Sequence, residues 1–368
     1  MGKKFIPGME LSKKYYNEIV KKIIIRAFPA LKYSSGLIDY GSDVLGYDTE
    51  VSMDHQWGPR LSIFLAPIDL QKYGIELDNA LSEQLPHDFY GFSTNFSGSK
   101  EDYIRRMENS NNGKVKHLIR IHSLEDFFQQ HLGFNIHDEI KPLDWLFFPK
   151  QRLATIYKGQ VFHDDLNLKA IKKKLEYYPI DIWYYLMACE WEKIATEEAF
   201  VGRCGDVDDD LGSSLIASRI IQSLVNLCFL QEKKYIPYSK WYGTAFKNLE
   251  AARILYPICI SILHSSNWKE RESYLSKAYS FMANKHNELQ ITEPLNSVVK
   301  PYYGRKYLVI SAQDFSEKIF AKINDPEIRK LNRIGNIDQV TNTSRILENV
   351  ETISKFKYLY NSNFEAHK

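Results

Sequence analysis

A run of polar and acidic residues stands directly before a strongly apolar segment in the first quarter of the chain. Gly41-Ser42 opens this run in the stretch GSDVLGYDTEVSMDHQWGPRLSIFL, and the acids Asp48, Glu50 and Asp54 follow. Carboxylates near a core cost free energy unless a cation or hydrogen-bond donors pair with them. A Gly-Ser turn lets backbone N–H groups approach a phosphate, and acids about a dozen residues later can hold Mg²⁺ against it. The stretch predicts a metal–phosphate site or, alternatively, a polar turn with capping acids.

Arg60 heads the apolar segment and has two possible roles. Its guanidinium could bind a phosphate through two parallel N–H groups, or it could pair with Asp54 or Asp48. Trp57, three residues earlier, could stack on a base, although a core position is the more ordinary role for a tryptophan. These residues matter only if the chain folds so that they meet.

The elements that would position them follow from hydrophobic spacing in the first 140 residues. Residues 12–28 have helical spacing, with Ser12 as a candidate N-cap, and residues 60–67 form an apolar run that predicts a strand. Residues 114–123 alternate and predict a second strand, and residues 124–134 predict a helix. This order of elements predicts an α+β fold, with a mixed β-sheet and flanking helices.

The sequence changes character at about residue 141, where helical patterns take over. Long apolar-periodic segments cover residues 180–205, 206–235, 243–264 and 269–289, with short connections between them. Short connections place successive helices side by side in antiparallel order. We therefore expect two domains, a sheet domain over residues 1–140 and an α-helical bundle over residues 141–368.

Charge and cysteine content argue against some classes of protein. Lys and Arg number 48 against 46 Asp and Glu, and this balance argues against a protein that grips nucleic acid electrostatically, without excluding a local basic patch. Aromatic residues make up 14%, which favours a thick core over a stacking pocket. The four cysteines form no C-x-x-C pair and are interpreted as free thiols of a reducing compartment. With no secretory signal and no apolar run near 18 residues, a cytoplasmic protein without membrane spans is expected.

Acidic and basic residues of the expected bundle are candidates for chemistry. Glu190 and Glu197 are seven residues apart on one helical face, with Glu198 beside them, and an acid facing a cleft could deprotonate an attacking hydroxyl. The more ordinary interpretation is a charged face or a partner to Arg203 and Arg219. Arg219 lies among apolar residues and, if buried, needs a partner such as an acid or a phosphate. Motifs of P-loop, Rossmann, zincin and α/β-hydrolase enzymes are absent.

Four segments together resemble a known family. The opening stretch, EEAFVGRCGDVDDDLGSSLIASRI, PYSKWYGTAF and IGNIDQV are similar to the bacterial family called domain of unknown function 4037, over nearly the whole chain. That family is regarded as nucleotidyltransferase-like, within the polymerase β superfamily. The layout also resembles, more distantly, the streptomycin and spectinomycin adenylyltransferases, which place a sheet domain before a helical bundle and bind substrate in the cleft between them.

The resemblance implies a site of defined parts. Gly41 and Ser42 would hold the triphosphate, Asp54 would bind the metal, and Gln56 stands where a second carboxylate is usual. Asp48 or Glu50 could substitute for that carboxylate. In the bundle, Ser239 and Lys240 match a Ser-Lys pair that reaches the ATP phosphates. The residues implied are Asp54, Glu190 and Glu198 for catalysis; Gly41, Ser42, Arg60, Arg219, Ser239 and Lys240 for the nucleotide; and Asp54, Asp48 and Gln56 for the metal.

The favoured interpretation is an enzyme that transfers a nucleotidyl group. It would use Mg²⁺ or Mn²⁺ with a nucleoside triphosphate, preferably ATP, and an unknown hydroxyl acceptor, a small molecule rather than nucleic acid. A catalytically degenerate nucleotide- or ligand-binding protein of the same fold is the first alternative, because Gln56 replaces an acid. A structural or interaction module is the second. The first two differ in whether Asp48 or Glu50 points toward Asp54.

Overall fold

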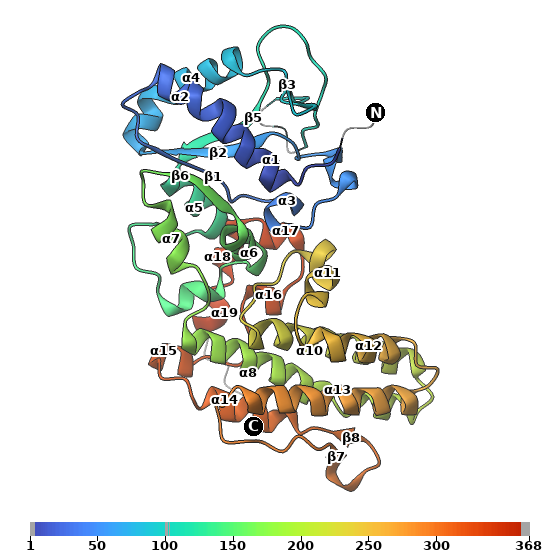
Figure 1. Ribbon diagram of the computed structural model, residues 1–368. Coiled ribbons are helices and arrows are strands. Elements are labelled where there is room, and N and C mark those ends of the chain that lie inside the picture. Colours follow the sequence, from blue (N-terminus) through green and yellow to red (C-terminus); the bar gives the residue numbers. More distant parts are fainter. Residues whose placement is uncertain (1–3, 100–101, 103, 362–368) are drawn as a thin grey trace. The chain divides into compact units, whose positions relative to one another are not determined.

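The chain folds into two compact units, one of which is discontinuous in sequence. In the computed structural model, which describes residues 4–99, 102 and 104–361, the first unit comprises residues 1–139 and 151–176 and the second comprises 140–150 and 177–368 (Figure 1). The first unit contains a mixed sheet with helices, and the second is predominantly helical. The α+β class is therefore confirmed. The observed division differs from the expected one in residues 151–176, which return to the first unit.

A four-stranded sheet organises the first unit. Its strands lie in the order β5-β2-β1-β6, with β1 antiparallel to both of its neighbours and β2 parallel to β5. The bounds are Tyr33–Leu37 for β1, Arg60–Leu65 for β2, Leu118–Ser123 for β5 and Gln160–Asp164 for β6. The strands expected over 60–67 and 114–123 correspond to β2 and β5. The edge strand β6 accounts for the return of residues 151–176, because it pairs with β1.

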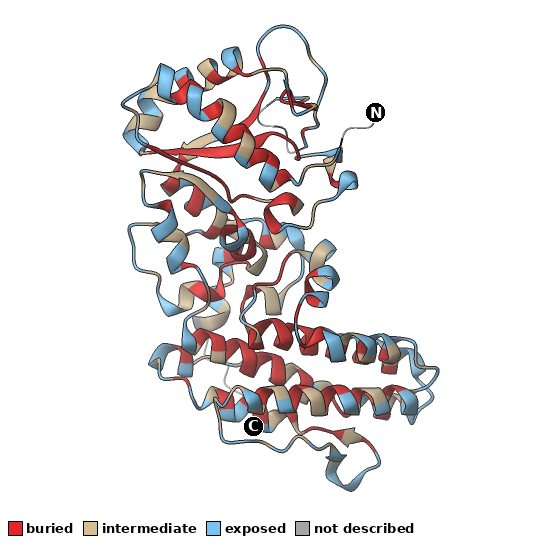
Figure 2. Ribbon diagram, viewed as in Figure 1, coloured by how far each residue is buried: buried red, intermediate tan, exposed pale blue. Residues whose placement is uncertain are grey.

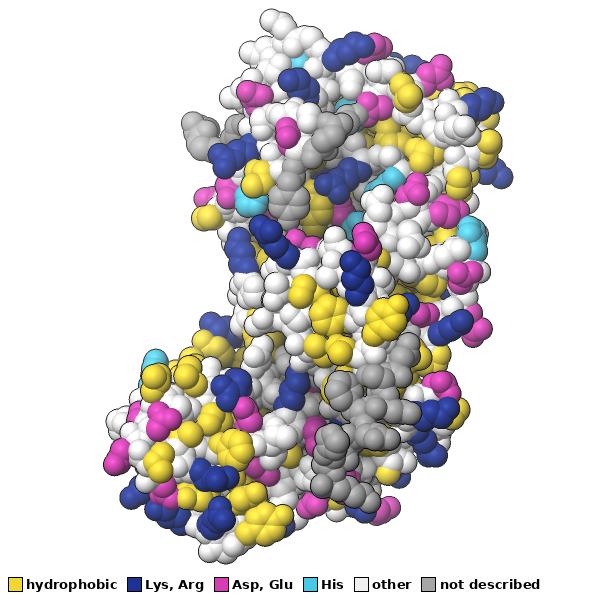
Figure 3. All heavy atoms as spheres, turned by 180° about the vertical axis from the view of Figure 1, so that it is seen from behind, with side chains coloured by type: hydrophobic (Ala, Val, Ile, Leu, Met, Phe, Trp, Pro, Cys, Tyr) yellow, Lys and Arg dark blue, Asp and Glu magenta, His cyan; other side chains and the backbone are white. Residues whose placement is uncertain are grey.

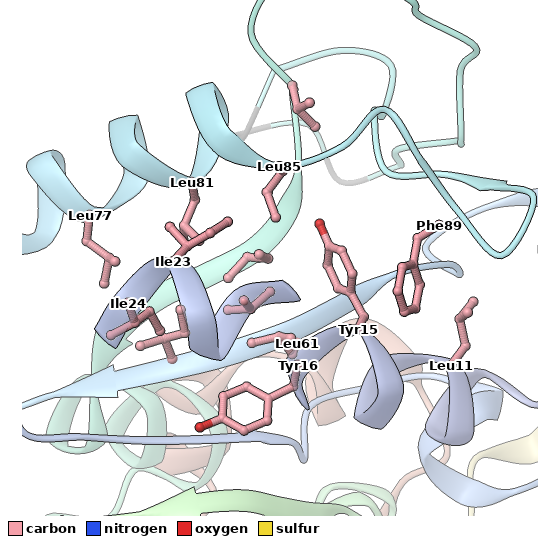
Figure 4. Packing of buried hydrophobic residues seen from close by; sticks show 14 of the residues in the cluster. Leu11, Tyr15, Tyr16, Ile23, Ile24, Leu61, Leu77, Leu81, Leu85 and Phe89 are labelled. Atoms are coloured by element: carbon pink, nitrogen blue, oxygen red, sulfur yellow. The ribbon is translucent and has the colours of Figure 1, made fainter. Parts of the chain in front are cut away.

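Alternation along β2 separates an apolar face from a face that carries polar groups. Leu61, Ile63 and Leu65 belong to the main core of this unit, where they pack with residues of the N-terminal helices and of α4 (Pro67–Gln84) (Figure 4). Successive side chains of a strand point to opposite faces, so Arg60 and Ser62 lie on the other side. The apolar face anchors the sheet, and this leaves the opposite face available for a polar cluster.

The N-terminal helical segment is continuous from Gly8 to Ala27. It consists of α1 (Gly8–Tyr15), the π-helical turn η1 (Tyr16–Val20) and α2 (Lys21–Ala27). The helix begins after Pro7, whose fixed φ suits a helix start. Ser12 is buried inside α1, so its expected role as N-cap is wrong.

The remaining elements of the first unit are short. The loop after β1 contains α3 (Ser42–Leu45) and the 3₁₀ turn η2 (Glu50–Asp54), and a small hairpin is formed by β3 (Asp88–Phe89) and β4 (Phe92–Ser93). Helix α5 (Leu124–Leu132) follows β5 directly and is capped by Ser123, which accepts a hydrogen bond from the Asp126 N–H. Helices α6 (Lys150–Lys158) and α7 (Leu168–Lys174) flank β6.

Long helices form the body of the second unit. Helix α8 packs against α10 and α14, and α10 packs against α9, α12 and α13. Both α8 and α10 are buried along much of their length (Figure 2). The bounds are Ile180–Glu197 for α8, Phe200–Gly205 for α9, Asp210–Gln231 for α10, Ala252–Leu263 for α12, Trp268–Glu288 for α13 and Ala312–Phe320 for α14. The expected helix over 180–205 is thus two helices.

Shorter elements complete the second unit. They are η3 (Pro142–Leu146), η4 (Ser239–Trp241), α11 (Tyr242–Lys247), β7 (Lys300–Pro301), η5 (Tyr302–Gly304), β8 (Leu308–Val309), α15 (Pro326–Arg329), α16 (Ile337–Val340), α17 (Ser344–Leu347), α18 (Val350–Lys355) and α19 (Tyr358–Asn361). The Asn336 side chain caps α16, in a capping box with Gln339.

Two features bear on the environment of the chain. Cys189, Cys204, Cys228 and Cys259 are free thiols, as the sequence predicts. Within the described part of the chain, α10 alone is long and apolar enough to cross a membrane, with a mean hydropathy of 1.4. Of its apolar window, 67% is buried within the structure. The core helix of a bundle meets the same criteria, so α10 is only weak evidence for a membrane span.

Candidate functional site

Polar side chains gather at one end of the sheet in the first unit. Because β1 is antiparallel to β2 and β2 is parallel to β5, the end of β1 and the starts of β2 and β5 lie at the same edge. Asp39 and Tyr40 follow β1, and Arg60 begins β2. Arg120 lies on β5, opposite Ser62 of β2 in the strand register. The polar cluster, as we call it, consists of Asp39, Tyr40, Asp43, Arg60, Arg120 and His131.

A buried ion pair between Asp43 and Arg60 forms one half of the polar cluster. The Nε and Nη2 atoms of Arg60 donate to the two carboxylate oxygens of Asp43 at 3.0 and 2.7 Å, and Nη2 also donates to the Tyr40 carbonyl at 2.6 Å. Only 3% of Arg60 and 1% of Asp43 is exposed. Burial opposes the charge of Arg60, but the Asp43 carboxylate outweighs it and raises the pKa of Arg60. Arg60 is therefore committed to Asp43, and the alternatives Asp54 and Asp48 are wrong.

Asp39 forms the other half of the polar cluster. One of its oxygens accepts a hydrogen bond from Arg120 Nη1 at 2.6 Å, and the other lies 2.8 Å from His131 Nε2 on α5. Burial alone would raise the pKa of Asp39, but the His131 hydrogen bond and the charge of Arg120 lower it to about 2. Asp39 therefore stays a carboxylate at neutral pH, with both oxygens paired.

Arg120 is the most exposed charged member of the polar cluster. Its guanidinium contacts Asp39 and the Tyr40 hydroxyl, lies 4.6 Å from the centroid of the Tyr40 ring, and belongs to a side chain that is 43% exposed. An arginine offers five N–H donors, and the contacts with Asp39 and Tyr40 use two of them. The Tyr40 hydroxyl donates to Gln56 Oε1 at 2.7 Å, which connects the cluster to the loop before β2. Arg120 can therefore still donate to an anion from solvent.

Gly41 and Ser42 lie beside the polar cluster. Gly41 has φ +128°, and a Cβ there would lie 2.2 Å from Asp43 Oδ1 and 2.5 Å from Arg60 Nη2. Glycine is required at this position because any side chain would enter the Asp43–Arg60 pair. Ser42 begins α3 and is half-buried. The two residues predicted to hold phosphate are thus beside a charged cluster. The close approach of the Asp43–Arg60 pair already explains why position 41 is a glycine.

The three predicted metal ligands do not form one group. Asp48 Oδ2 accepts hydrogen bonds from the Gly8 N–H at 2.7 Å and from Trp57 Nε1 at 2.8 Å, which ties the start of α1 to the loop before β2. Asp54 lies at the end of η2, is 63% exposed and pairs with His55 Nδ1 at 2.9 Å. Gln56 bonds to Tyr40 and, through its N–H, to the Arg105 carbonyl. Trp57 is buried in the core.

The described residues include no metal site made of protein ligands alone. Over the ranges 4–99, 102 and 104–361, no three His, Cys, Asp or Glu side chains lie together as such a site needs. At the sheet edge, the buried carboxylates of Asp39 and Asp43 already have arginine partners. The positive charge that a metal would bring is therefore supplied by guanidinium groups.

His122 lies on the same strand as Arg120, but its ring packs against an aromatic side chain and is uncharged. It is stacked on Phe64, with ring centroids 4.9 Å apart, and its buried Nε2 has no hydrogen-bonding partner. Burial lowers the pKa of His122 to about 4, so the ring is neutral at pH 7. It is packed as an aromatic residue and adds no charge to the polar cluster.

The two bundle glutamates predicted for catalysis have different surroundings. Glu198 accepts hydrogen bonds from the N–H groups of Ile310 and Ala312, at 2.9 and 3.2 Å, and so holds the start of α14. Burial raises the pKa of Glu198 to about 7. Glu190 is 1% exposed, and its Oε1 accepts from Asn226 at 2.9 Å and from Gln339 at 2.8 Å. Its Oε2 is buried without a partner.

The predicted phosphate ligands of the second unit lie on its surface. Arg219 forms a two-pronged ion pair with Glu197 and is 56% exposed, so it is neither buried nor paired with Glu190 or Glu198. Ser239 and Lys240 are exposed in η4, and Lys240 Nζ lies 5.0 Å from the centroid of the Trp241 ring.

Sequence reasoning missed Asp39, Asp43 and His131. Asp43 lies inside the opening stretch, but its partner Arg60 is 17 residues away and the positive φ of Gly46, which ends α3, turns the chain between them. Asp39 directly follows the apolar strand residues 37 and 38, and an acid at the end of a strand was the available signal. His131 reaches Asp39 across 92 residues of sequence, which no local pattern reveals.

Comparison with known proteins identifies a family segment and one distant structural relative. Residues 145–242 match the family described as Domain of unknown function (DUF4037), which confirms the expected resemblance over that segment. No curated protein matches the chain. A solved structure to which the chain is similar is that of a nucleotidyltransferase-like protein from Exiguobacterium sibiricum 255-15. The identity is 9%, the TM-score is 0.36, and the match covers 94% of this chain and 90% of that one.

Proposed function

We propose that the first unit binds the phosphate groups of a nucleotide without a metal ion, and that Arg120 makes the anion contact. The observation that carries this proposal is the state of the charges at the sheet edge. Asp39 and Asp43 are neutralised by Arg120 and Arg60, whereas Arg120 is 43% exposed and retains N–H donors. Guanidinium N–H groups match the geometry of phosphate oxygens and can bind them in pairs.

The nucleotide part of the proposal comes from the sequence resemblance to nucleotidyltransferases. Tyr40, whose ring faces both Arg60 and Arg120, adds an aromatic surface beside the phosphate position. The acceptor, the choice of ATP over other nucleotides and the base remain predictions. Lys, Arg, Asp and Glu side chains are interspersed on the face shown in Figure 3, which gives no support to nucleic acid as the ligand.

Transfer of a nucleotidyl group is the second candidate function. It is favoured by Asp54, whose exposed carboxylate is held by a single histidine neighbour and is accessible to a ligand. It is disfavoured by Asp48, which points to Gly8 and Trp57 and not toward Asp54. The acids that separate transfer from binding are Asp48 and Glu50, and of these Asp48 favours binding.

The proposal is tested by calorimetric titration of ATP, GTP, CTP and UTP in the presence of EDTA. We expect the wild-type chain to bind at least one of them, and Arg120→Ala to lose about tenfold or more in affinity, the usual value of a charge-assisted hydrogen bond. Arg120→Lys keeps a charge beside Asp39 and should fall between the two. Arg26→Ala, an exposed arginine on α2, is the matched control and should bind as the wild type does. Equal binding by Arg120→Ala and wild type would refute the role of Arg120.

A further inference from the structure

A small cavity inside the second unit contains a carboxylate oxygen without a partner. The cavity has a volume of about 30 Å³ and is lined by Tyr178, Glu190, Asn226, Tyr235, Gln339 and Lys234, among others. Glu190 is 1% exposed, and its Oε2 makes no hydrogen bond with any residue that the structure describes. A buried carboxylate that lacks donors is costly, so this oxygen is unusual for a purely structural residue.

The other oxygen of Glu190 is fixed by a network from three helices. Asn226 on α10 and Gln339 on α16 each donate an amide N–H to Oε1, while Lys193 Nζ lies 3.9 Å away. The two amides are themselves held, because the Tyr242 hydroxyl donates to Asn226 Oδ1 and the Asn336 N–H donates to Gln339 Oε1. The network fixes the direction of the carboxylate and leaves Oε2 without a donor.

The backbone at the start of α16 is built to place Gln339. Gly335 has φ +94°, and a Cβ there would lie 2.5 Å from the Gln339 Cβ. Only glycine allows this approach without strain. Asn336 then caps α16 through the Gln339 N–H. The segment IGNIDQV, which the function of the first unit does not use, therefore serves to orient one donor toward Glu190.

The walls of the cavity suit a cationic group. Tyr235 is buried and Tyr178 is half-buried, with ring centroids 5.1 Å apart, and Phe229 also lines the cavity. Aromatic faces and a carboxylate oxygen together favour an ammonium group. Lys150 and Lys234 line the cavity as well and would repel a cation that carries no anionic group. Lys234 is exposed, so an anionic part of the ligand could meet it from solvent.

We propose that this cavity binds the ammonium group of a small amine that also carries an anionic group. The ammonium would donate to Glu190 Oε2, and the anionic group would pair with Lys150 or Lys234. All of these residues belong to the second unit, so the inference does not depend on nucleotide binding by the first.

The test is thermal and calorimetric titration of the full chain with defined probes. β-Alanine and O-phosphoethanolamine carry both groups, ethanolamine carries only the amine, and acetate carries only the anion. A ligand that binds the folded state raises the melting temperature, and the rise grows with the logarithm of the ligand concentration above Kd. We expect a shift with at least one of the two-group probes, a smaller shift with ethanolamine and none with acetate.

Two variants on the same helix make the test specific. Glu190→Gln keeps the shape and an acceptor for Asn226 and Gln339 but removes the charge, and it should lose about tenfold or more in affinity. Glu197→Gln lies on α8 outside the cavity and should respond as the wild type does. The proposal is overturned if no two-group probe shifts the wild type, or if the shift persists in Glu190→Gln. A crystal structure grown with the probe that shows only a water at Oε2 would overturn it too.

Discussion

The polar cluster of the first unit and the Glu190 cavity of the second solve the same problem differently. Both bury a carboxylate. In the polar cluster, each oxygen of Asp39 and Asp43 has a donor, and two arginines supply the opposite charge. In the cavity, two neutral amides hold one oxygen of Glu190, with Lys193 Nζ 3.9 Å from it, and no described residue donates to the other. Complete pairing indicates a structural ion-pair network in which the exposed Arg120 still has donors for a ligand. Incomplete pairing indicates that the Glu190 carboxylate can accept a hydrogen bond from a ligand.

Removing Arg60 should cause the largest loss of stability, because it leaves a carboxylate of the polar cluster unpaired. Arg60→Met would leave the Asp43 carboxylate buried without its partner, and breaking a buried pair in this way costs about 3–5 kcal/mol. Urea unfolding followed by tryptophan fluorescence and circular dichroism measures the loss. Arg219→Met removes an exposed pair and should cost no more than about 1 kcal/mol. Similar losses for the two variants would contradict the structural role of the Asp43–Arg60 pair.

Glu198 allows a test of carboxylate burial by pH. Burial raises its pKa from 4.5 to about 7, against the opposing effect of the Ile310 and Ala312 N–H groups. The folded state therefore holds this proton more tightly than the unfolded state, and the stabilisation is complete below pH 4.5 and lost as pH rises through about 7. The free energy of unfolding should fall by up to about 3 kcal/mol over this window on account of Glu198.

The control for that pH dependence is a neutral replacement at the same position. Glu198→Gln cannot titrate, so its free energy of unfolding should vary less with pH than that of the wild type, while Glu197→Gln should keep the wild-type slope. The measurement is urea unfolding at about pH 5 and about pH 8. Parallel slopes for the wild type and Glu198→Gln would show that Glu198 does not titrate in this range.

Gly41 gives a smaller effect that bears directly on the polar cluster. Gly41→Ala would place a Cβ at φ +128° and within 2.5 Å of Arg60 Nη2, at a cost of about 1–3 kcal/mol. Gly46→Ala is the matched control, because Gly46 also has a positive φ but open space around its Cβ position. Gly41 lies at φ 128°, ψ 155° and Gly46 in the left-handed region at φ 75°, ψ 30°, so the difference between the two, measured by thermal unfolding, combines contact with the ion pair and the rarer backbone region of Gly41. Equal costs would mean that backbone strain alone explains both.

Local patterns predicted the elements that depend on local order. Strands β2 and β5 and helix α5 follow from the spacing of their apolar residues. Strand β6 was missed because its side chains are only half-buried and its pairing with β1 spans some 130 residues, as the Ser34–Asp164 hydrogen bond shows. Asp164 in that segment accepts a hydrogen bond from the Leu168 N–H at the start of α7.

The sequence predicted where the candidate site lies better than it predicted which side chains pair with one another there. The opening stretch does lie at the sheet edge, and the Gly-Ser turn does stand beside charged groups. Which acid pairs with Arg60 depends on a turn at Gly46 and on the approach of α1 to Asp48, which spacing does not encode. Likewise, Gln339 meets Glu190 across 149 residues, so the orientation of that carboxylate was beyond any local pattern.

The central claim is that nucleotide phosphates bind to arginine and not to a metal held by acids. It is tested most directly by titrating ATP calorimetrically with Mg²⁺ and with EDTA, for the wild type and Asp54→Ala. We expect binding in EDTA that Mg²⁺ does not strengthen and that Asp54→Ala does not weaken. Binding that requires Mg²⁺ and is lost in Asp54→Ala would contradict it and would restore the metal-dependent transfer reaction.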